Sequence, residues 1–140
     1  MYTGGFHALA HLDKDGKNDR TPETPNVLGI YLLHAVARDM LERGIATLRK
    51  DTEDKAAMIY DALAHAPGIE LEAFDPAYRS QTTIVAATPG GSKPIIERLK
   101  GEGFLIHTGY GERKDTHIRI ANFAAHTGED VETLCSLLRG

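Results

Sequence analysis

The run from Thr116 to Phe123 near the C-terminus constrains the fold more than any other part of the chain. It is rich in residues that favour strands, and it contains one arginine. Because side chains in a strand alternate between two faces, Ile118 and Ile120 share one face, and His117 and Arg119 share the other. The run therefore predicts a strand with a buried apolar face and an opposite face that carries a guanidinium group.

A charged, glycine-containing loop, Gly109–Lys114, comes just before this strand and contains Arg113. One arginine fixed on a sheet, with a second on a nearby loop, suits the binding of a carboxylate or a phosphate. The same pattern is compatible with a strand face that is simply solvated, which is where most charged side chains lie. Both interpretations stay open at this point.

The composition is that of one soluble globular domain. The chain has 140 residues, of which 41% are hydrophobic and 26% charged, and its net charge is −4. It has no basic stripe with interleaved aromatic residues, no long apolar run and no N-terminal secretory pattern, so nucleic acid and membrane are not expected partners. The single cysteine, Cys135, is expected to be a core residue, and a cytoplasmic location fits.

The first twenty residues show little regular pattern. Residues 6–12 are compatible with a short helix, and Asp13–Asp19 is expected to be a polar turn. His7 and His11 are spaced as ligands on a helix, but no third ligand has a convincing position. We therefore expect no metal site.

Two long helical patterns follow. The first is expected to begin with Thr24 as N-cap and Pro25 in the first turn, and to end or bend at Arg43–Gly44. The second runs from about residue 45 to 66 and stops at a Pro-Gly pair. Its charged side, which includes Lys55, is expected to be solvated.

The second half of the chain alternates between strand and helix patterns. Ser92 is expected to cap a helix over about 93–101, and Thr127 with Asp130 is expected to cap the last helix. The four predicted strands are Ile69–Phe74, Thr82–Ala87, Phe104–His107 and Thr116–Phe123. This order predicts an α+β fold with a small four-stranded antiparallel or mixed sheet, helices on one face, and two long helices before it.

Two segments together resemble a known family. Arg20–Asn26 precedes the first long helix, and His117–Phe123 precedes the last. Both are similar to the C-terminal part of class V, fold-type I aminotransferases that use pyridoxal phosphate, in particular the phosphoserine aminotransferases. Tyr78–Ser80 and Gly101–Phe104 fit the same pattern, and the likeness runs from about Gly4 to the C-terminus.

The resemblance implies a domain within a larger enzyme. Residues 1–20 would join it to the large, cofactor-binding domain, and residues 21–140 would form the small domain of a cytoplasmic homodimer. The family exchanges the amino group of glutamate with 3-phosphohydroxypyruvate, giving 2-oxoglutarate and phosphoserine for serine biosynthesis, and the cofactor serves as electron sink.

The resemblance also assigns roles to three residues. Arg119 would bind the α-carboxylate of the substrate, and Arg113 its phosphate or side-chain carboxylate. Thr21 would reach the cofactor phosphate of the other subunit. Arg20 and Glu112 depart from the family pattern, which has a polar amide and a histidine there, and an acid at 112 would repel a phosphate.

The chain lacks a lysine in the context where the family carries the cofactor as a Schiff base; its lysines are at 14, 17, 50, 55, 93, 100 and 114. We therefore predict no catalytic residue in the chain, no bound cofactor and no transamination by this piece alone. Two alternatives remain: a free-standing α+β module that binds an anionic amino acid or phosphate metabolite, and another class V transaminase of the alanine–glyoxylate type.

Overall fold

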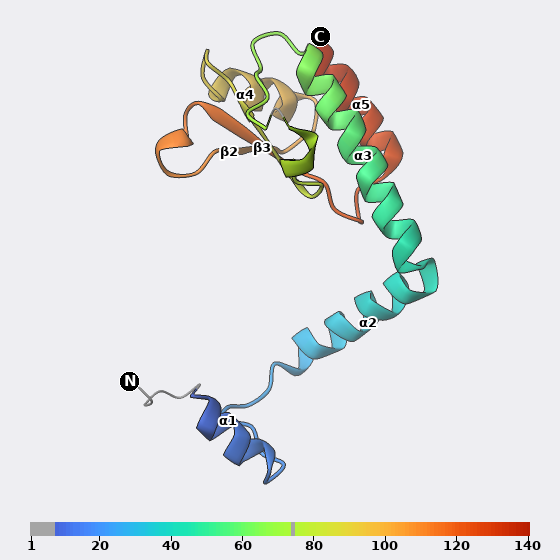
Figure 1. Cartoon of the computed structure of the whole chain (residues 1–140), viewed down its shortest axis with the longest axis vertical. Coiled ribbons are helices and arrows are strands. Elements are labelled where there is room, and N and C mark those ends of the chain that lie inside the picture. Colours follow the sequence, from blue (N-terminus) through green and yellow to red (C-terminus); the bar gives the residue numbers. More distant parts are fainter. Residues whose placement is uncertain (1–7, 74) are drawn as a thin grey trace. The chain divides into compact units, whose positions relative to one another are not determined.

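The computed structural model of the chain describes residues 8–73 and 75–140 (Figure 1). The chain forms two compact units, Met1–Glu42 and Arg43–Gly140. The division falls next to the Arg43–Gly44 break that the sequence predicts. The predicted division into residues 1–20 and 21–140 concerns a whole enzyme, and it stays a prediction.

Helix α1 (Leu9–Gly16) is longer than the sequence predicts. The expected turn at Asp13–Asp19 is wrong over its first half, because these residues continue the helix. Lys17 forms an ion pair with Asp13, at 2.6 Å, and the Asn18 side chain donates to the carbonyl of Lys14 at the helix end. Pairs four residues apart stabilise a helix in this way, and the turn comes only after Gly16.

Helix α2 (Val27–Arg43) begins two residues later than predicted. The Asn26 side-chain oxygen accepts a hydrogen bond from the N–H of Gly29, at 2.9 Å, so asparagine caps the helix in place of Thr24. Gly29 fits this cap, because a Cβ there would lie only 2.8 Å from the Asn26 amide nitrogen.

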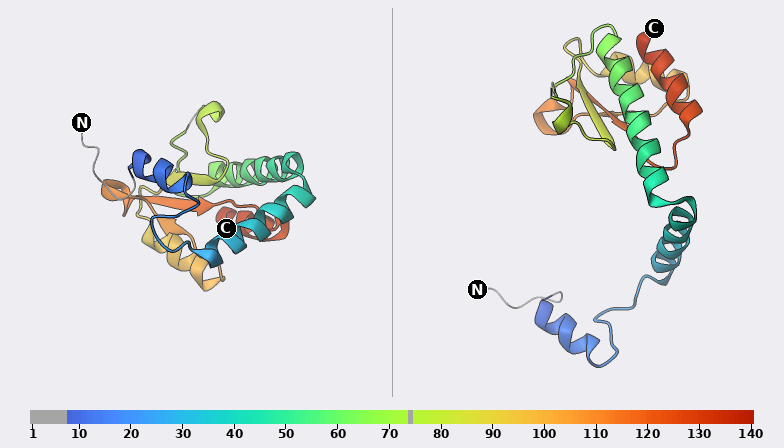
Figure 2. Two further views of the ribbon diagram at one scale, coloured as in Figure 1. Left: turned by 90° about the horizontal axis from the view of Figure 1, so that it is seen from below. Right: turned by 45° about the vertical axis from the view of Figure 1, so that its right-hand side comes forward.

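Gly44 separates α2 from helix α3 (Ile45–His65), as predicted. Its φ of +85° is a left-handed conformation that glycine adopts without strain. Within the C-terminal unit α3 lies beside the last helix, α5 (Gly128–Arg139), which Figures 1 and 2 both show. The predicted cap of α5 is confirmed: Thr127 and Asp130 form a reciprocal capping box with backbone hydrogen bonds of 3.1 Å.

The described sheet has three antiparallel strands, β1 (Thr83–Ala87), β2 (His107–Thr108) and β3 (His117–Ala121). Their order is β1-β3-β2, so β3 is the central strand. Two short 3₁₀ turns, Pro76–Tyr78 and Gly111–Arg113, lie in the connections. The α+β class and the antiparallel pairing are confirmed, and β2 keeps only the last residue of its predicted range.

The four-stranded sheet is not found in the described residues. Of the predicted strand Ile69–Phe74, only Glu70 pairs with β1, in one bridge to Ala87, and Phe74 lies outside the described residues. The segment then turns towards α3: Arg79 donates to the carbonyl of Ala73, and the Tyr60 hydroxyl of α3 donates to the carbonyl of Ser80. The Ala73 carbonyl of the predicted strand therefore accepts from a side chain and not from a neighbouring strand.

The hydrophobic core lies between the isoleucine face of the sheet and the helices. Ile118 pairs with Ala86, and Ile120 with Ile84, and all four are buried. Cys135 belongs to this core as predicted, and burial raises the pKa of its thiol. The buried core side chains from α3, α4 (Lys93–Gly101) and α5 are Ala56, Ile59, Tyr60, Ala62, Leu63, Leu99, Val131, Leu134, Cys135 and Leu138. The prediction that helices cover one sheet face is therefore confirmed.

Lys55 of α3 is buried, contrary to the prediction. The sequence predicts a solvated side chain, but Lys55 is only 2% exposed. Its ammonium group pairs with Asp51 at 2.8 Å and donates to the carbonyls of His126 and Phe123, at 2.7 and 3.3 Å. The prediction was wrong because the connection between β3 and α5 folds over this point of the helix, and its backbone carbonyls need a donor.

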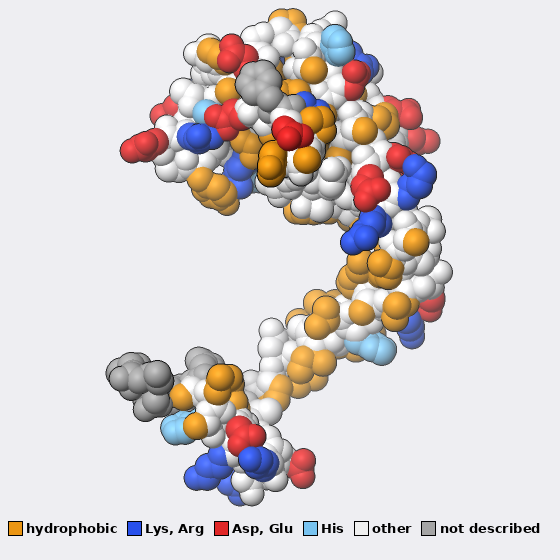
Figure 3. All heavy atoms as spheres, viewed as in Figure 1, with side chains coloured by type: hydrophobic (Ala, Val, Ile, Leu, Met, Phe, Trp, Pro, Cys, Tyr) orange, Lys and Arg blue, Asp and Glu red, His pale blue; other side chains and the backbone are white. Residues whose placement is uncertain are grey.

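Helix α2 presents many apolar side chains to solvent, and none of its residues is buried. Eight large side chains of α2 are between 52 and 71% exposed, and Figure 3 shows hydrophobic atoms gathered along the helix: Val27, Leu28, Ile30, Tyr31, Leu32, Leu33, Val36 and Leu41. An exposed apolar surface of this extent is typical of a contact surface. Among the described residues, no helix is both long and apolar enough to cross a membrane.

Replacing Lys55 with methionine is expected to lower the free energy of unfolding by about 2 kcal/mol, because Asp51 and the carbonyls of Phe123 and His126 lose their donor. Lys50→Met is the matched control. Lys50 also pairs with an aspartate four residues along α3, but both side chains are exposed, and such pairs contribute little. Urea unfolding of both variants measures the difference, and equal losses of stability would contradict this account.

Self-association of the chain is expected to depend on α2. The double variant Leu28→Lys, Leu32→Lys should be more monomeric than the parent chain, because two ammonium groups cannot be buried in an apolar contact. Glu23→Lys changes the net charge by the same amount outside the helix and should leave association unchanged. Sedimentation velocity at several concentrations measures this, and a strictly monomeric parent chain would contradict it.

Candidate functional site

Arg119 lies on the central strand and points away from the isoleucine core. Its backbone is paired on both sides, with Val85 of β1 and His107 of β2. The side chain is half-buried, and its Nε donates to the carbonyl of Thr108 at 2.7 Å. The sheet therefore fixes the base of the side chain, and a backbone carbonyl fixes its orientation.

Tyr110 supports the Arg119 guanidinium from the preceding loop. The guanidinium carbon lies 3.6 Å from the centre of the tyrosine ring, which is a close cation–π contact. Tyr110 itself is 75% exposed. No acidic side chain of the described residues pairs with Arg119, and its two terminal nitrogens have no hydrogen bond there. The end of the guanidinium is therefore available for a bidentate contact with a carboxylate.

Gly109 and Ser92 fix the loop that carries Tyr110. A Cβ at Gly109 would collide with the backbone of Arg113, so only glycine fits this close approach. The N–H of Gly109 donates to the carbonyl of His117 at 2.8 Å. Ser92 precedes α4 as predicted, but its hydroxyl does not cap the helix. It donates to the carbonyl of Lys114 at 3.2 Å.

Glu72 joins the two basic groups on this side of the sheet. One carboxylate oxygen accepts a hydrogen bond from Arg113, and the other lies 2.9 Å from Nε2 of His117. Because an ionised carboxylate only accepts, Nε2 of His117 carries the hydrogen. Nδ1 of the same ring lies 2.9 Å from the hydroxyl of Thr116. Glu72, Arg113 and His117 form what we call the Glu72 cluster.

The Glu72 cluster favours the charged form of its carboxylate. The hydrogen bond from His117, together with the positive charge of Arg113, lowers the pKa of Glu72 below its ordinary value. The carboxylate is therefore ionised at neutral pH, and it balances the charge that Arg113 brings to the loop.

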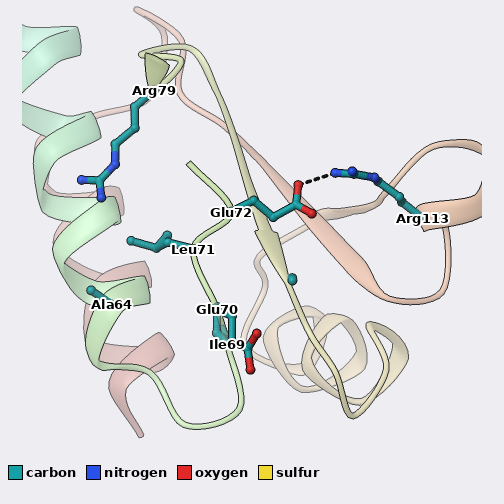
Figure 4. A pocket seen from close by; sticks show the side chains of 8 residues that line it. Ala64, Ile69, Glu70, Leu71, Glu72, Arg79 and Arg113 are labelled. Carbon is teal, nitrogen blue, oxygen red and sulfur yellow. Dashed lines mark hydrogen bonds and ion pairs between the residues drawn. The ribbon is translucent and has the colours of Figure 1, made fainter. Parts of the chain in front are cut away.

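An open hollow of about 810 Å³ adjoins the Glu72 cluster. Figure 4 shows Glu72 reaching towards Arg113 on one side and Arg79 lying on the other. Arg79 is oriented by the Tyr60 ring, 4.9 Å from its guanidinium carbon, and by the carbonyl of Ala73. The lining residues are Ala64, Ile69, Glu70, Leu71, Glu72, Arg79, Ala87 and Arg113.

The predicted site residues fall into two groups. Arg113 and Arg119 both belong to the C-terminal unit. Arg119 lies on β3, and Arg113 is connected through Glu72 to His117, which shares the sheet face of Arg119. Thr21 belongs to the N-terminal unit, where it is exposed before α2. The substrate roles of the two arginines and the cofactor role of Thr21 stay predictions.

The described lysines offer no free buried amine. Lys55 is buried but fully paired, and the others are exposed: 14, 17, 50, 93, 100 and 114. In residues 8–73 and 75–140, no cluster of three or more acidic, histidine or cysteine side chains is arranged to hold a metal ion. His11 is exposed, and His7 lies outside the described residues.

Solved structures with a similar fold include several aminotransferases. A phosphoserine aminotransferase from Cytophaga hutchinsonii is 38% identical with a TM-score of 0.84, and the match covers 97% of this chain and 38% of that enzyme. One from Bacillus circulans subsp. alkalophilus is 26% identical with a TM-score of 0.72, over 91% of this chain and 36% of that enzyme. The chain matches the C-terminal region of phosphoserine aminotransferases.

The resemblance that the sequence motifs predict is thus confirmed, and the chain spans less than two fifths of the matched enzymes' length. An aspartate aminotransferase of subgroup IV from Thermus thermophilus, 20% identical with a TM-score of 0.76, supports the fold alone, over 99% of this chain and 39% of that enzyme. No family model matches the chain. No curated protein sequence matches it either.

Sequence reasoning missed Glu72 and Tyr110. Glu70 and Glu72 alternate with Ile69 and Leu71, which is visible in the sequence and predicts an acidic strand face. That acidic face was a possible partner for the basic loop, but the pairing joins residues 41 and 45 positions apart. No local pattern identifies such a contact.

Glu72→Gln is expected to reduce stability at pH 7, and the loss should become smaller as the pH is lowered from 7 to 3. A carboxylate whose pKa is lowered on folding contributes stability above its unfolded pKa, and the contribution disappears as the pH falls through the folded pKa. Urea unfolding of parent and variant across this pH range measures the difference. A constant difference down to pH 3 would contradict the assignment of the pKa shift to Glu72.

Tyr110→Ala is expected to free the Arg119 guanidinium, whereas Tyr110→Phe should keep it in place, because only the ring face is needed for the contact. Hydrogen exchange at Nε of Arg119, followed by ¹⁵N NMR, should accelerate about two- to fivefold in the alanine variant. Equal exchange in the alanine and phenylalanine variants would show that the ring does not support the guanidinium.

Proposed function

We propose that the chain is the C-terminal small domain of a pyridoxal-phosphate-dependent phosphoserine aminotransferase. Such an enzyme transfers the amino group of glutamate to 3-phosphohydroxypyruvate, giving 2-oxoglutarate and phosphoserine. The observation that carries the proposal is the orientation of Arg119, a guanidinium held by a carbonyl and an aromatic ring, with its terminal nitrogens left for a ligand. The match to two phosphoserine aminotransferases supports it.

In this enzyme Arg119 binds the α-carboxylate that glutamate and the keto acid share. The Nε hydrogen bond to Thr108 leaves both terminal N–H groups for the two carboxylate oxygens. Lysine offers a single ammonium group that cannot reproduce this planar contact. Arg119 therefore orients substrate and excludes alternative poses, without moving a proton.

The residues of the chain fit one end of the cofactor. The exposed Thr21 has a hydroxyl group suited to a phosphate. The lysine that carries the cofactor must come from the large domain, because Lys55 is occupied by Asp51 and two carbonyls and the other lysines are exposed. When bound, pyridoxal phosphate supplies the electron sink for transamination. By itself, the chain is expected to be inactive.

Arg113 contacts the phosphate of the keto acid. Two acids lie next to Arg113: Glu112 precedes it in the sequence, and Glu72 is paired with it. Both reduce the positive charge that Arg113 presents to a phosphate. A keto acid with fewer negative charges than 3-phosphohydroxypyruvate would also suit these acids, so the chimaera is assayed with more than one keto acid.

The large domain and a second subunit are the partners that the proposal requires. Residues 1–20 form the connection to the large domain, and residues 21–140 form the small domain. The exposed apolar side chains of α2 supply surface for such contacts. In a homodimer, Thr21 contacts the cofactor phosphate of the neighbouring subunit.

The proposal is tested with a chimaera in which this chain replaces the corresponding C-terminal region of the Cytophaga hutchinsonii enzyme. The chimaera should convert glutamate and 3-phosphohydroxypyruvate, and Arg119→Ala should reduce kcat/KM for glutamate by about 100-fold or more. Lys93→Ala, in an exposed position at the start of α4, is the control for loss of a positive charge. A folded chimaera with normal turnover in the Arg119 variant would refute the role of Arg119.

Two further measurements separate the alternatives. Titration calorimetry of the 140-residue chain with glutamate and phosphoserine should show weak binding, because most contacts of a half-site are missing. Tight binding would favour a free-standing sensing module. Activity of the chimaera with alanine and glyoxylate, and not with 3-phosphohydroxypyruvate, would favour another class V transaminase.

A further inference from the structure

The Glu72 cluster has the geometry of an anion-binding site, and the anion that occupies it is the carboxylate of Glu72. Two donors, Arg113 and Nε2 of His117, each contact a different oxygen of one carboxylate. This spacing matches any group with two oxygens on one atom, which includes a phosphate as well as a carboxylate.

We propose that Arg113 and His117 form a binding pair for a phosphate group, and that Glu72 is an internal placeholder that sets the affinity of this pair. The incoming phosphate displaces the Glu72 carboxylate and takes over both hydrogen bonds. This assignment rests on the proposed function for the identity of the phosphate compound, but not for the binding itself.

His117 is held more firmly than the carboxylate that it contacts. His117 is only 8% exposed, lies on the central strand and has its second ring nitrogen next to the Thr116 hydroxyl. Arg113 belongs to a loop that Gly109 and Ser92 bind to the rest of the unit. Glu72 lies in no helix or strand, and its side chain is 39% exposed. Displacement of Glu72 therefore disturbs less structure than displacement of His117.

The open hollow beside the cluster gives a phosphate access. Glu72 and Arg113 both line it, and its volume of about 810 Å³ exceeds what a phosphate group needs. Figure 4 shows the carboxylate of Glu72 at the edge of this space, facing Arg113. The displaced side chain has solvent and the same hollow to move into.

Competition by Glu72 weakens phosphate binding in two ways. The site is competent only in the fraction of molecules whose Glu72 is displaced, and the apparent dissociation constant rises by the inverse of that fraction. The displaced carboxylate also stays close and repels the phosphate. Glu72→Gln removes the charge that causes both effects but keeps the size of the side chain.

The experiment uses the 140-residue chain and inorganic phosphate as the probe. The His117 ring signals are followed by two-dimensional NMR during the titration. We expect Glu72→Gln to bind phosphate about tenfold more tightly than the parent chain. Glu70→Gln is the matched control, because Glu70 lines the same hollow and carries the same charge, but forms no contact with either donor. Its affinity should stay close to that of the parent chain.

The double variant Glu72→Gln, Arg113→Gln should lose the gained affinity while its circular dichroism stays unchanged. Equal affinities of the parent chain and Glu72→Gln, or equal gains in Glu70→Gln and Glu72→Gln, would overturn the proposal. A second titration with phosphoserine and with serine tells whether a phosphate ester is accepted as well as the free ion; binding of serine at these signals would also overturn it. The phosphate titration involves neither cofactor nor turnover. A negative titration therefore does not contradict the aminotransferase proposal, and an inactive chimaera does not contradict the phosphate-binding proposal.

Discussion

The pairing of β3 between β1 and β2 is the interaction on which the rest of the C-terminal unit depends. A central strand has both backbone edges bonded, so its residues cannot rotate from one face to the other without breaking two ladders. The burial of Ile118 and Ile120 against the helices selects the register. That register alone puts His117 and Arg119 on the opposite face. The apolar core and the polar site are thus two consequences of one strand register.

Buried polar side chains attach the central strand and the connection after it to α3. Asn122, fully buried just after β3, donates to the carbonyls of Thr52 in α3 and Gln81 before β1. Lys55 binds the connection between β3 and α5 from the same helix. These donors attach the end of the central strand to α3 at two points, so the strand that bears Arg119 cannot slide along the helix. A side chain that must meet a carboxylate within a fraction of an ångström needs such support.

The two arginines of the site differ in how their positive charge is balanced. Arg119 is stacked on Tyr110 and keeps its terminal nitrogens for a ligand, whereas Arg113 is already paired with Glu72. An arginine supported by a neutral ring presents its full charge, and one paired with an acid presents less. In our proposals, Arg119 is thus a ready site for a carboxylate, and Arg113 belongs to a phosphate site at which a ligand has to compete with Glu72. The carboxylate end and the phosphate end of a phosphorylated amino acid would therefore be recognised by two sites of different charge.

Local patterns in the sequence determined the helix break at Gly44, the capping box of α5, the strand at 117–121 and the outward direction of Arg119, because each depends on residues only a few positions apart. Tertiary structure decided the rest. It buried Lys55, which a charged helix face predicts to be solvated, because a distant loop brings two carbonyls to it. It reduced the predicted strand 69–74 to one bridge, and it chose Glu72 as the partner of Arg113 and His117. Periodicity says which face a side chain takes, but a partner 41 or 45 residues away is set by the packing of whole elements, which no short pattern contains.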